Sequence, residues 1–454
     1  MRRVSLLLVL LFVLAACTTT ADDATDDSDQ ADPTPTATAV VDEQEPDPTP
    51  TPEPEPTPTP EPTPTVTPEP EEADSDVDLG EFVDEVAANV AELRGLEVLE
   101  ELNVEIMSRD ELLELLEEET EITQSEIDLY WILRLLDDRD IELEEMLIDV
   151  QASDIYGLYM FENETVYVVA ESEDLSAMEE VFLAHEITHA LQDQHFNVGD
   201  RMMEMEEDEY DAMFAFLAML EGDAVLTQEL YALAYLDSDQ LVEYQRELLE
   251  AVMDDEASAM LDELPRYIVE SFSFPYIEGP MFMINAFAGD LNVIDQFLED
   301  PPVSTQQVMN PSGFMDGTVA PPVEVELPDL DSLLGDSWVL YDTGTVGTFD
   351  LMIMLEENGV ADPYEALESW RGSRFAMYED EDGTDVVAVA RNIWADEEAA
   401  LVFEDLLLQT MADYEATDGV YAGNDRYHIV QTDGDTVTLF SASSEEAVRA
   451  AADQ

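Results

Sequence analysis

The sequence has no lysine and few basic side chains of any kind. Fourteen arginines stand against 111 aspartates and glutamates, so the 454 residues carry a formal net charge of −97. Such a chain cannot build the basic surface that neutralises phosphates, and the sequence therefore excludes nucleic acid as a partner. Cysteine is also scarce: the only one is Cys17, which excludes an intramolecular disulfide framework.

The negative charge extends along the whole chain. Residues 18–80 contain 19 acidic and no basic side chains, and residues 81–454 still carry about −80, from 92 acidic side chains and twelve arginines. Repulsion between these charges destabilises a compact state, and salt weakens it by shortening the Debye length to about 3 Å at 1 M. We interpret the composition as an adaptation to high salt; compositional drift in an ordinary acidic secreted protein is the alternative.

The first seventeen residues have the pattern of an export signal. Two arginines precede an apolar run over residues 4–14, which is too short to span a membrane as a helix. Residues 14–17, Leu-Ala-Ala-Cys, resemble the lipobox at which prokaryotic lipoproteins are cleaved. The resemblance implies that residues 1–17 are a signal peptide and that Cys17 carries a lipid. The lipid would anchor the protein on the outer face of the cell membrane, or in the outer membrane if the host has one. A soluble secreted protein is the alternative.

Residues 18–79 consist mainly of threonine, proline and acidic residues, with alternating prolines over residues 46–64. Such a segment has too little apolar surface to fold and is predicted to be disordered. Pro-rich chains extend by about 3.1 Å per residue, so this stalk could hold the following domain roughly 150 Å from a membrane. A tail without a spacing role is the alternative.

The remainder is predicted to form an α+β protein with two domains, residues 80–330 and 331–454. The first is rich in apolar residues at helical spacing, and two short β-branched and aromatic runs around residues 162–164 predict a β-hairpin. In the second, strands are expected near 374–379, 386–394, 426–430 and 435–440, with helices near 396–413 and at the C-terminus. That pattern indicates a small α+β domain, and it contains no recognisable chemical motif.

A metal-binding pattern follows the hairpin. Ser176 and Glu179 have the spacing of a capping box, and the helix that they begin contains His185-Glu186-Ile187-Thr188-His189. Histidines at i and i+4 project from one face of a helix and can hold a metal ion, with the intervening glutamate beside the open coordination position. We therefore predict His185 and His189 as ligands of zinc (Zn2+) and Glu186 as the general base.

Two residues compete as the third ligand. His195 has the spacing of an extended motif in which a glycine breaks the helix, but Gln192 occupies the glycine position. If the helix continues, His195 turns away from the metal face. Glu221 lies on an apolar stripe of a second helix, expected over 212–236 and interrupted at 221–224, where an unpaired carboxylate would be costly. We predict Glu221 as the ligand, and expect Asp223 to face solvent.

These residues carry a family resemblance. HEITHALQDQHF at 185–196, followed by LEGDA at 220–224, resembles secreted and lipid-anchored prokaryotic zincins of the gluzincin type. Two further stretches, FPYIEG at 274–279 and PPVSTQQ at 301–307, are similar to the same group. Residues 370–374, WRGSR, depart from the expected WGGDR. Val225 stands where thermolysin-like enzymes carry an aspartate, which leaves the hydrogen-bond partners of the two histidines unassigned.

The resemblance implies a zincin-like metallopeptidase domain that hydrolyses peptide or protein substrates with zinc-activated water and Glu186. The hairpin could present an edge strand to an extended peptide. Tyr276 is a candidate for the donor that stabilises the oxyanion together with the metal. The alternative is a catalytically inactive zincin-fold surface lipoprotein that acts as a binding or scaffold module, and a purely structural zinc site is a third reading.

Overall fold

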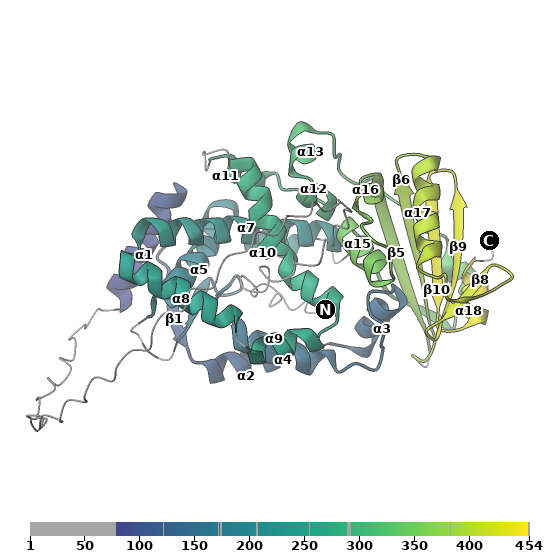
Figure 1. The fold of residues 1–454 in the computed structure, drawn as a ribbon, viewed down its shortest axis with the longest axis horizontal. Coiled ribbons are helices and arrows are strands. Elements are labelled where there is room, and N and C mark those ends of the chain that lie inside the picture. The colour runs from purple at the N-terminus through teal and green to yellow at the C-terminus, as the bar shows by residue number, and fades with distance from the viewer. Residues whose placement is uncertain are drawn as a thin grey trace, which may run out of the picture. The chain divides into compact units, whose positions relative to one another are not determined.

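The computed structural model describes residues 79–452, except 121, 171, 173, 174, 206, 207, 254, 288–291 and 382. The predicted signal peptide, the predicted lipid attachment at Cys17 and the predicted stalk up to residue 78 lie outside these residues, whereas Leu79, the last residue of the predicted stalk, begins α1. The described residues fall within one compact unit, which is helix-rich and of the α+β class, as predicted (Figure 1). Among the described helices, none combines the length and the apolar character that crossing a membrane requires.

The first part of the chain forms a three-stranded sheet among helices. β2 and β3 pair antiparallel, with Gly157 opposite Val168, and form the predicted hairpin. β1 adds to β3 in parallel, which the sequence analysis did not predict. The strand order β1-β3-β2 leaves β2 at an edge of the sheet. The elements are α1 (Leu79–Arg94), β1 (Asn103–Met107), α2 (Arg109–Glu119), α3 (Gln124–Ile132), α4 (Leu143–Asp154), β2 (Gly157–Met160) and β3 (Thr165–Val169).

A series of helices follows the hairpin. The first, α5, begins with the predicted capping box, in which Ser176 accepts from the N–H of Glu179, and ends at Asn197 in the left-handed conformation (φ 55°). The helices are α5 (Ala177–Phe196), α6 (Val198–Glu204), α7 (Tyr210–Tyr235), α8 (Ser238–Val252), α9 (Asp255–Glu263), α10 (Arg266–Phe287), α11 (Asn292–Glu299), α12 (Thr305–Met309), α13 (Pro311–Asp316) and α14 (Leu330–Leu334). α7 continues through residues 221–224, so the predicted interruption there is wrong.

Two glycines allow α7 and α10 to cross with their backbones in contact. A Cβ atom at Gly222 of α7 would lie 2.4 Å from the carbonyl carbon of Gly279 in α10. A Cβ atom at Gly279 would lie 2.1 Å from the carbonyl oxygen of Ala218. Only glycine fits such an approach. The crossing therefore gives a structural role to the glycines of both sequence stretches, LEGDA and FPYIEG, and it lies next to Glu221.

The C-terminal part is a seven-stranded antiparallel sheet in the order β4-β5-β6-β10-β9-β8-β7. The four predicted strands correspond to β5, β6, β9 and β10, and both predicted helices are present as α17 and α18, whereas β4, β7 and β8 were not predicted. The elements are β4 (Trp338–Gly344), α15 (Thr348–Glu357), α16 (Tyr364–Leu367), β5 (Trp370–Asp380), β6 (Val386–Trp394), α17 (Glu397–Gln409), β7 (Glu415–Thr417), β8 (Val420–Gly423), β9 (Arg426–Asp433), β10 (Thr436–Ala442) and α18 (Glu445–Ala452).

Residues from the first part of the chain contribute to the core on this sheet. Trp131 of α3 belongs to the same buried cluster as Trp370 and Trp394. The buried Arg426 donates to the carbonyl oxygen of Trp131 at 2.5 Å, and the buried Arg134 donates to Thr410 Oγ1 at 2.6 Å. Arg426 of β9 thus connects the end of α3 to the sheet, and Arg134 connects it to the end of α17. The domain boundary near residue 330 stays a prediction.

The stretch 301–307 connects α7 to the sheet. Asp211, at the start of α7, is buried and accepts hydrogen bonds from Thr305 Oγ1 at 2.6 Å and from its backbone N–H at 3.0 Å. Gln306 Nε2 donates to the carbonyl oxygens of Leu367 and Trp370. In the WRGSR segment, Arg374 forms an ion pair with Asp208. Both stretches therefore have structural partners in the part of the chain that the structure describes.

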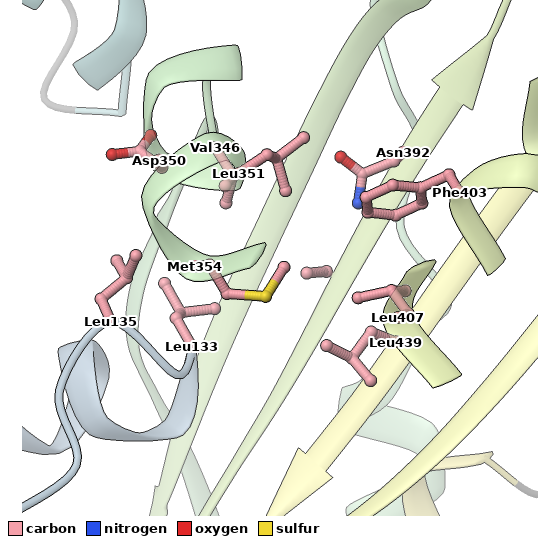
Figure 2. A pocket seen from close by; sticks show the side chains of 11 residues that line it. Leu133, Leu135, Val346, Asp350, Leu351, Met354, Asn392, Phe403, Leu407 and Leu439 are labelled. Carbon is pink, nitrogen blue, oxygen red and sulfur yellow. The ribbon is translucent and has the colours of Figure 1, made fainter. Parts of the chain in front are cut away.

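A small cavity lies under the sheet (Figure 2). Its volume of about 20 Å³ is enough for a water molecule but not for a substrate. Aliphatic side chains form most of its wall, and the polar exceptions are Asp350 and Asn392. The cavity is too small and too apolar to indicate a catalytic site.

Candidate metal centre

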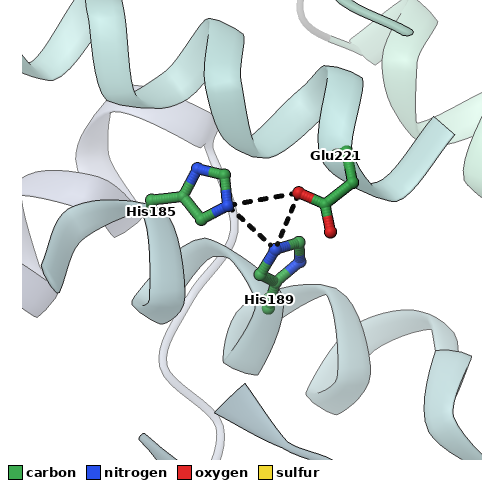
Figure 3. Close-up of side chains that lie close together, drawn as sticks. All are labelled: His185, His189 and Glu221. Atoms are coloured by element: carbon green, nitrogen blue, oxygen red, sulfur yellow. Dashed lines mark hydrogen bonds and ion pairs between the residues drawn. The ribbon is translucent and has the colours of Figure 1, made fainter. Parts of the chain in front are cut away.

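Two buried helices, α5 and α7, bring His185, His189 and Glu221 together (Figure 3). α5 is covered by apolar residues of α1, β3, α7 and α8, which explains why its sequence is apolar on all sides. α7 packs between α5 and α10. The i, i+4 spacing points both imidazoles toward α7, and the carboxylate of Glu221 completes the group.

The three side chains have the separations of metal ligands. His185 Nε2 lies 3.1 Å from His189 Nε2, and Glu221 Oε2 lies 3.3 Å and 3.5 Å from these two nitrogens. Ligands at about 2.05 Å from a tetrahedral zinc ion are separated by about 3.3 Å. Two imidazoles and one carboxylate are also a known catalytic zinc set. The residues present therefore fit the ion that the sequence pattern predicts.

The electrostatics of the centre also favour a cation. All three side chains are at most 2% exposed, so water cannot separate their lone pairs. In the metal-free protein, burial acts to lower the pKa of His189, but the Glu221 carboxylate outweighs it and raises that pKa to about 9. Burial acts to raise the pKa of Glu221, and the two imidazoles outweigh it and lower that pKa. The three groups thus hold a positive charge between them, as a proton or as a metal ion.

Glu186 lies beside this group and next to the edge strand. Its side chain is fully buried, and its carboxylate lies at the backbone N–H of Tyr159 in β2, which acts to lower its pKa. A Cβ atom at Gly157 of β2 would lie 2.9 Å from Glu186 Cγ, so the strand leaves space for the carboxylate only because this residue is glycine. Burial raises the pKa of Glu186 to about 7, against the opposing effect of the two histidines. Such a carboxyl group can take up a proton near neutral pH.

His195 does not join the group. α5 continues through Gln192 to Phe196, as the absence of the helix-breaking glycine predicted. His195 Nε2 instead lies 2.7 Å from the carbonyl oxygen of Glu97, and the metal-ligand group of the described residues contains Glu221 in its place.

Two glutamines that the sequence analysis did not assign contact the predicted ligands. His185 Nδ1 lies 3.0 Å from Gln228 Oε1, and His189 Nδ1 lies 2.9 Å from Gln192 Oε1. Gln192 follows His189 by three residues, and Gln228 follows Glu221 by seven. Both spacings return to the same helix face, and this is the signal that could have identified them.

The expectation that Asp223 faces solvent is wrong. Its side chain is fully buried and forms an ion pair with Arg94 of α1, with Arg94 Nε 2.7 Å from Asp223 Oδ1. Arg94 Nη2 also lies 2.8 Å from Asp295 Oδ1. The reason is that α1 packs against α7, so the side of α7 that faces away from α10 is also inside the protein.

Tyr276 lies within α10, the helix that crosses α7, and is 9% exposed. Its role as an oxyanion donor stays a prediction.

The match to a known family lies in the C-terminal part of the chain, away from the candidate metal centre. A family model described as a domain of unknown function (DUF8575) matches residues 339–452. No curated protein and no solved structure matches the chain. The matched residues run from β4 to the end of α18 and include none of the residues of the candidate metal centre.

Proposed function

We propose that the protein is a zinc-dependent metallopeptidase. The observation that carries the proposal is the convergence of His185, His189 and Glu221 at 3.1–3.5 Å, with the buried carboxylate of Glu186 beside them. A zinc ion bound there would lower the pKa of its water toward 7 and polarise the scissile carbonyl.

Glu186 acts as the general base. Its pKa of about 7 allows it to accept a proton from water at neutral pH and to return that proton to the leaving nitrogen.

β2 provides the place for the substrate. As the edge strand of the three-stranded sheet, it can add an extended peptide by backbone hydrogen bonds. Gly157 of this strand lies against Glu186, which would bring the peptide backbone close to the base. Tyr276 remains the proposed second donor to the oxyanion.

The proposed site of action is outside the cytoplasm, on the membrane surface. This part of the proposal rests on the sequence of residues 1–17, with a lipid on Cys17 and the stalk of residues 18–79 as the tether. Extracellular or membrane-surface proteins of halophiles meet molar salt, which the charge of the chain requires.

Zinc content and peptide hydrolysis, both measured in molar salt, test the proposal. Wild-type protein should bind one zinc per chain and hydrolyse a denatured protein such as casein. Glu186→Gln should keep the zinc and lose hydrolysis, because only the base is removed. Glu221→Ala should weaken zinc binding strongly, whereas His195→Ala should keep the stoichiometry.

Two results would contradict the proposed activity, and a third would change the assignment of the third ligand. Full activity of Glu186→Gln would exclude the mechanism. A zinc-loaded wild type that cleaves no peptide at any salt concentration would favour the catalytically inactive binding or scaffold module. If His195→Ala lost the metal and Glu221→Ala kept it, His195 would be the third ligand.

A further inference from the structure

The orientation of the Gln192 side chain is fixed by its neighbours. Its Nε2 donates to the carbonyl oxygen of Leu220 at 3.0 Å and to Asp223 Oδ2 at 2.9 Å. Both are acceptors that can contact only the NH2 end of the amide. The oxygen of Gln192 must therefore face His189, which means that Nδ1 of His189 carries the proton and donates it at 2.9 Å.

A second set of contacts fixes Gln228 in the same way. Tyr244 donates its hydroxyl proton to Glu229 Oε1 at 2.9 Å, so its oxygen is free to accept from Gln228 Nε2 at 3.3 Å. The amide oxygen of Gln228 then faces His185 Nδ1 at 3.0 Å. This nitrogen too must be the protonated one.

We infer from this geometry that Gln192 and Gln228 are positioning residues for the metal centre. Each accepts the Nδ1 proton of one histidine, so that the lone pair of Nε2 points to the position between the three ligands. Gln192 is held by the buried Asp223–Arg94 ion pair, and Gln228 by the Tyr244–Glu229 hydrogen bond. The inference rests on the proposed metal centre and adds the residues that orient it.

The Arg94–Asp223 pair gives this arrangement its rigidity. Both side chains are fully buried, and Asp223 bonds to Gln192 as well as to Arg94. A buried carboxylate with two fixed partners has little freedom to move. α1 therefore contributes to the metal centre although it supplies none of the three ligands.

The test measures zinc affinity by competition with a chelator in molar salt, for Gln192→Leu, Gln228→Leu and the control Gln194→Leu. Gln194 lies on the same helix but binds the backbone of Leu99 and Glu100. Loss of a hydrogen-bond partner of a ligand histidine should reduce affinity about 10- to 100-fold. The control should stay within about twofold of wild type.

Nuclear magnetic resonance of histidine-labelled, zinc-loaded protein gives a second readout that does not depend on activity. The chain has only four histidines, so the Nδ1–H protons of His185 and His189 can be assigned singly. Gln192→Leu should expose the His189 proton to exchange and leave that of His185 protected, and Gln228→Leu should do the reverse. A general loss of packing would affect both.

Glutamate substitutions distinguish the hydrogen-bond network of Gln192 from that of Gln228. Gln228→Glu should weaken zinc binding less than Gln192→Glu, because Tyr244 can turn its single hydroxyl proton from Glu229 to the new carboxylate. Gln192→Glu should weaken zinc binding, because the new oxygen would face Asp223 and the Leu220 carbonyl, which are both acceptors.

The results distinguish the inference from the proposed function. If folded Gln192→Leu and Gln228→Leu both bind zinc as tightly as Gln194→Leu, the inference is overturned while the metal centre stands. If the wild type binds no zinc, the proposed function itself fails. If Gln192→Leu does not fold, Gln228→Leu alone decides, because the hydrogen bonds of Gln228 do not involve Gln192 or Asp223.

Discussion

The crossing of α7 and α10 gives a prediction whose size follows from the structure. Gly279→Ala would place a methyl group 2.1 Å from the carbonyl oxygen of Ala218. An ordinary carbon–oxygen contact is about 3.4 Å, so the two helices must separate by about 1.3 Å. The opposing atom belongs to the backbone and cannot turn away, so the whole helix has to move.

The expected cost is moderate for stability and larger for the metal centre. Overpacking costs about 1–3 kcal/mol, and the better helix propensity of alanine offsets about 1 kcal/mol, which leaves a net loss of at most about 2 kcal/mol. With an entropy of unfolding of about 2.1 cal/mol/K per residue, this loss lowers Tm by at most roughly 3 °C. Metal–ligand distances tolerate only about 0.2 Å, and Glu221 lies next to the crossing, so zinc affinity should fall clearly.

Thermal unfolding with and without zinc, together with chelator competition, measures both effects. Gly80→Ala is the control, because Gly80 is exposed in the first turn of α1 and alanine there should not destabilise the protein. If Gly279→Ala kept both the Tm and the zinc affinity of the wild type, the helices would not be in backbone contact, and the reasoning would be refuted.

Two further predictions concern pH and the membrane. Burial raises the pKa of Asp211 from 3.8 to about 7, against the Thr305 hydrogen bonds, so the native state holds this proton more tightly than the unfolded chain. The stability that this proton contributes is complete below pH 3.8 and is lost as the pH rises through about 7. Asp211→Asn should therefore reduce the loss of unfolding free energy between pH 5 and pH 8, measured by denaturant unfolding. An unchanged pH dependence would contradict the assignment. Cys17→Ser should release the protein from membranes, and full retention after a salt wash would exclude the lipid anchor.

The residues of the candidate metal centre were largely predictable because their signals are local. The capping box, the spacing of His185 and His189 and the presence of Gln192 in place of glycine all act within one helix, α5. Glu221 required a second helix, but its place on an apolar stripe was sufficient, because a buried carboxylate needs a partner. The structure brings these residues together as the sequence indicated.

The predictions that were wrong or missing concern features that depend on contacts between elements far apart in the sequence. The helical wheel placed Asp223 on a side of α7 that was assumed to face solvent. In the structure α1 covers that side, so Asp223 is buried. The parallel pairing of β1 with β3 joins residues about 60 positions apart and leaves no local pattern. Gln192 lies three residues after His189 on α5 and was recognisable from spacing, whereas the contact of Gln228 with His185 depends on the docking of α7 against α5.

The burial of three arginines increases the excess of negative charge at the surface and therefore the number of counterions around the protein. Three of the twelve arginines in residues 81–454, namely Arg94, Arg134 and Arg426, are in the interior, which leaves nine to offset the acidic groups at the surface. Cations of the medium must therefore provide most of the neutralisation, and this layer of counterions becomes a component of the native state. Dilution into fresh water changes no internal contact directly but lengthens the range over which the acidic groups repel one another, so the high-salt interpretation predicts unfolding on dilution.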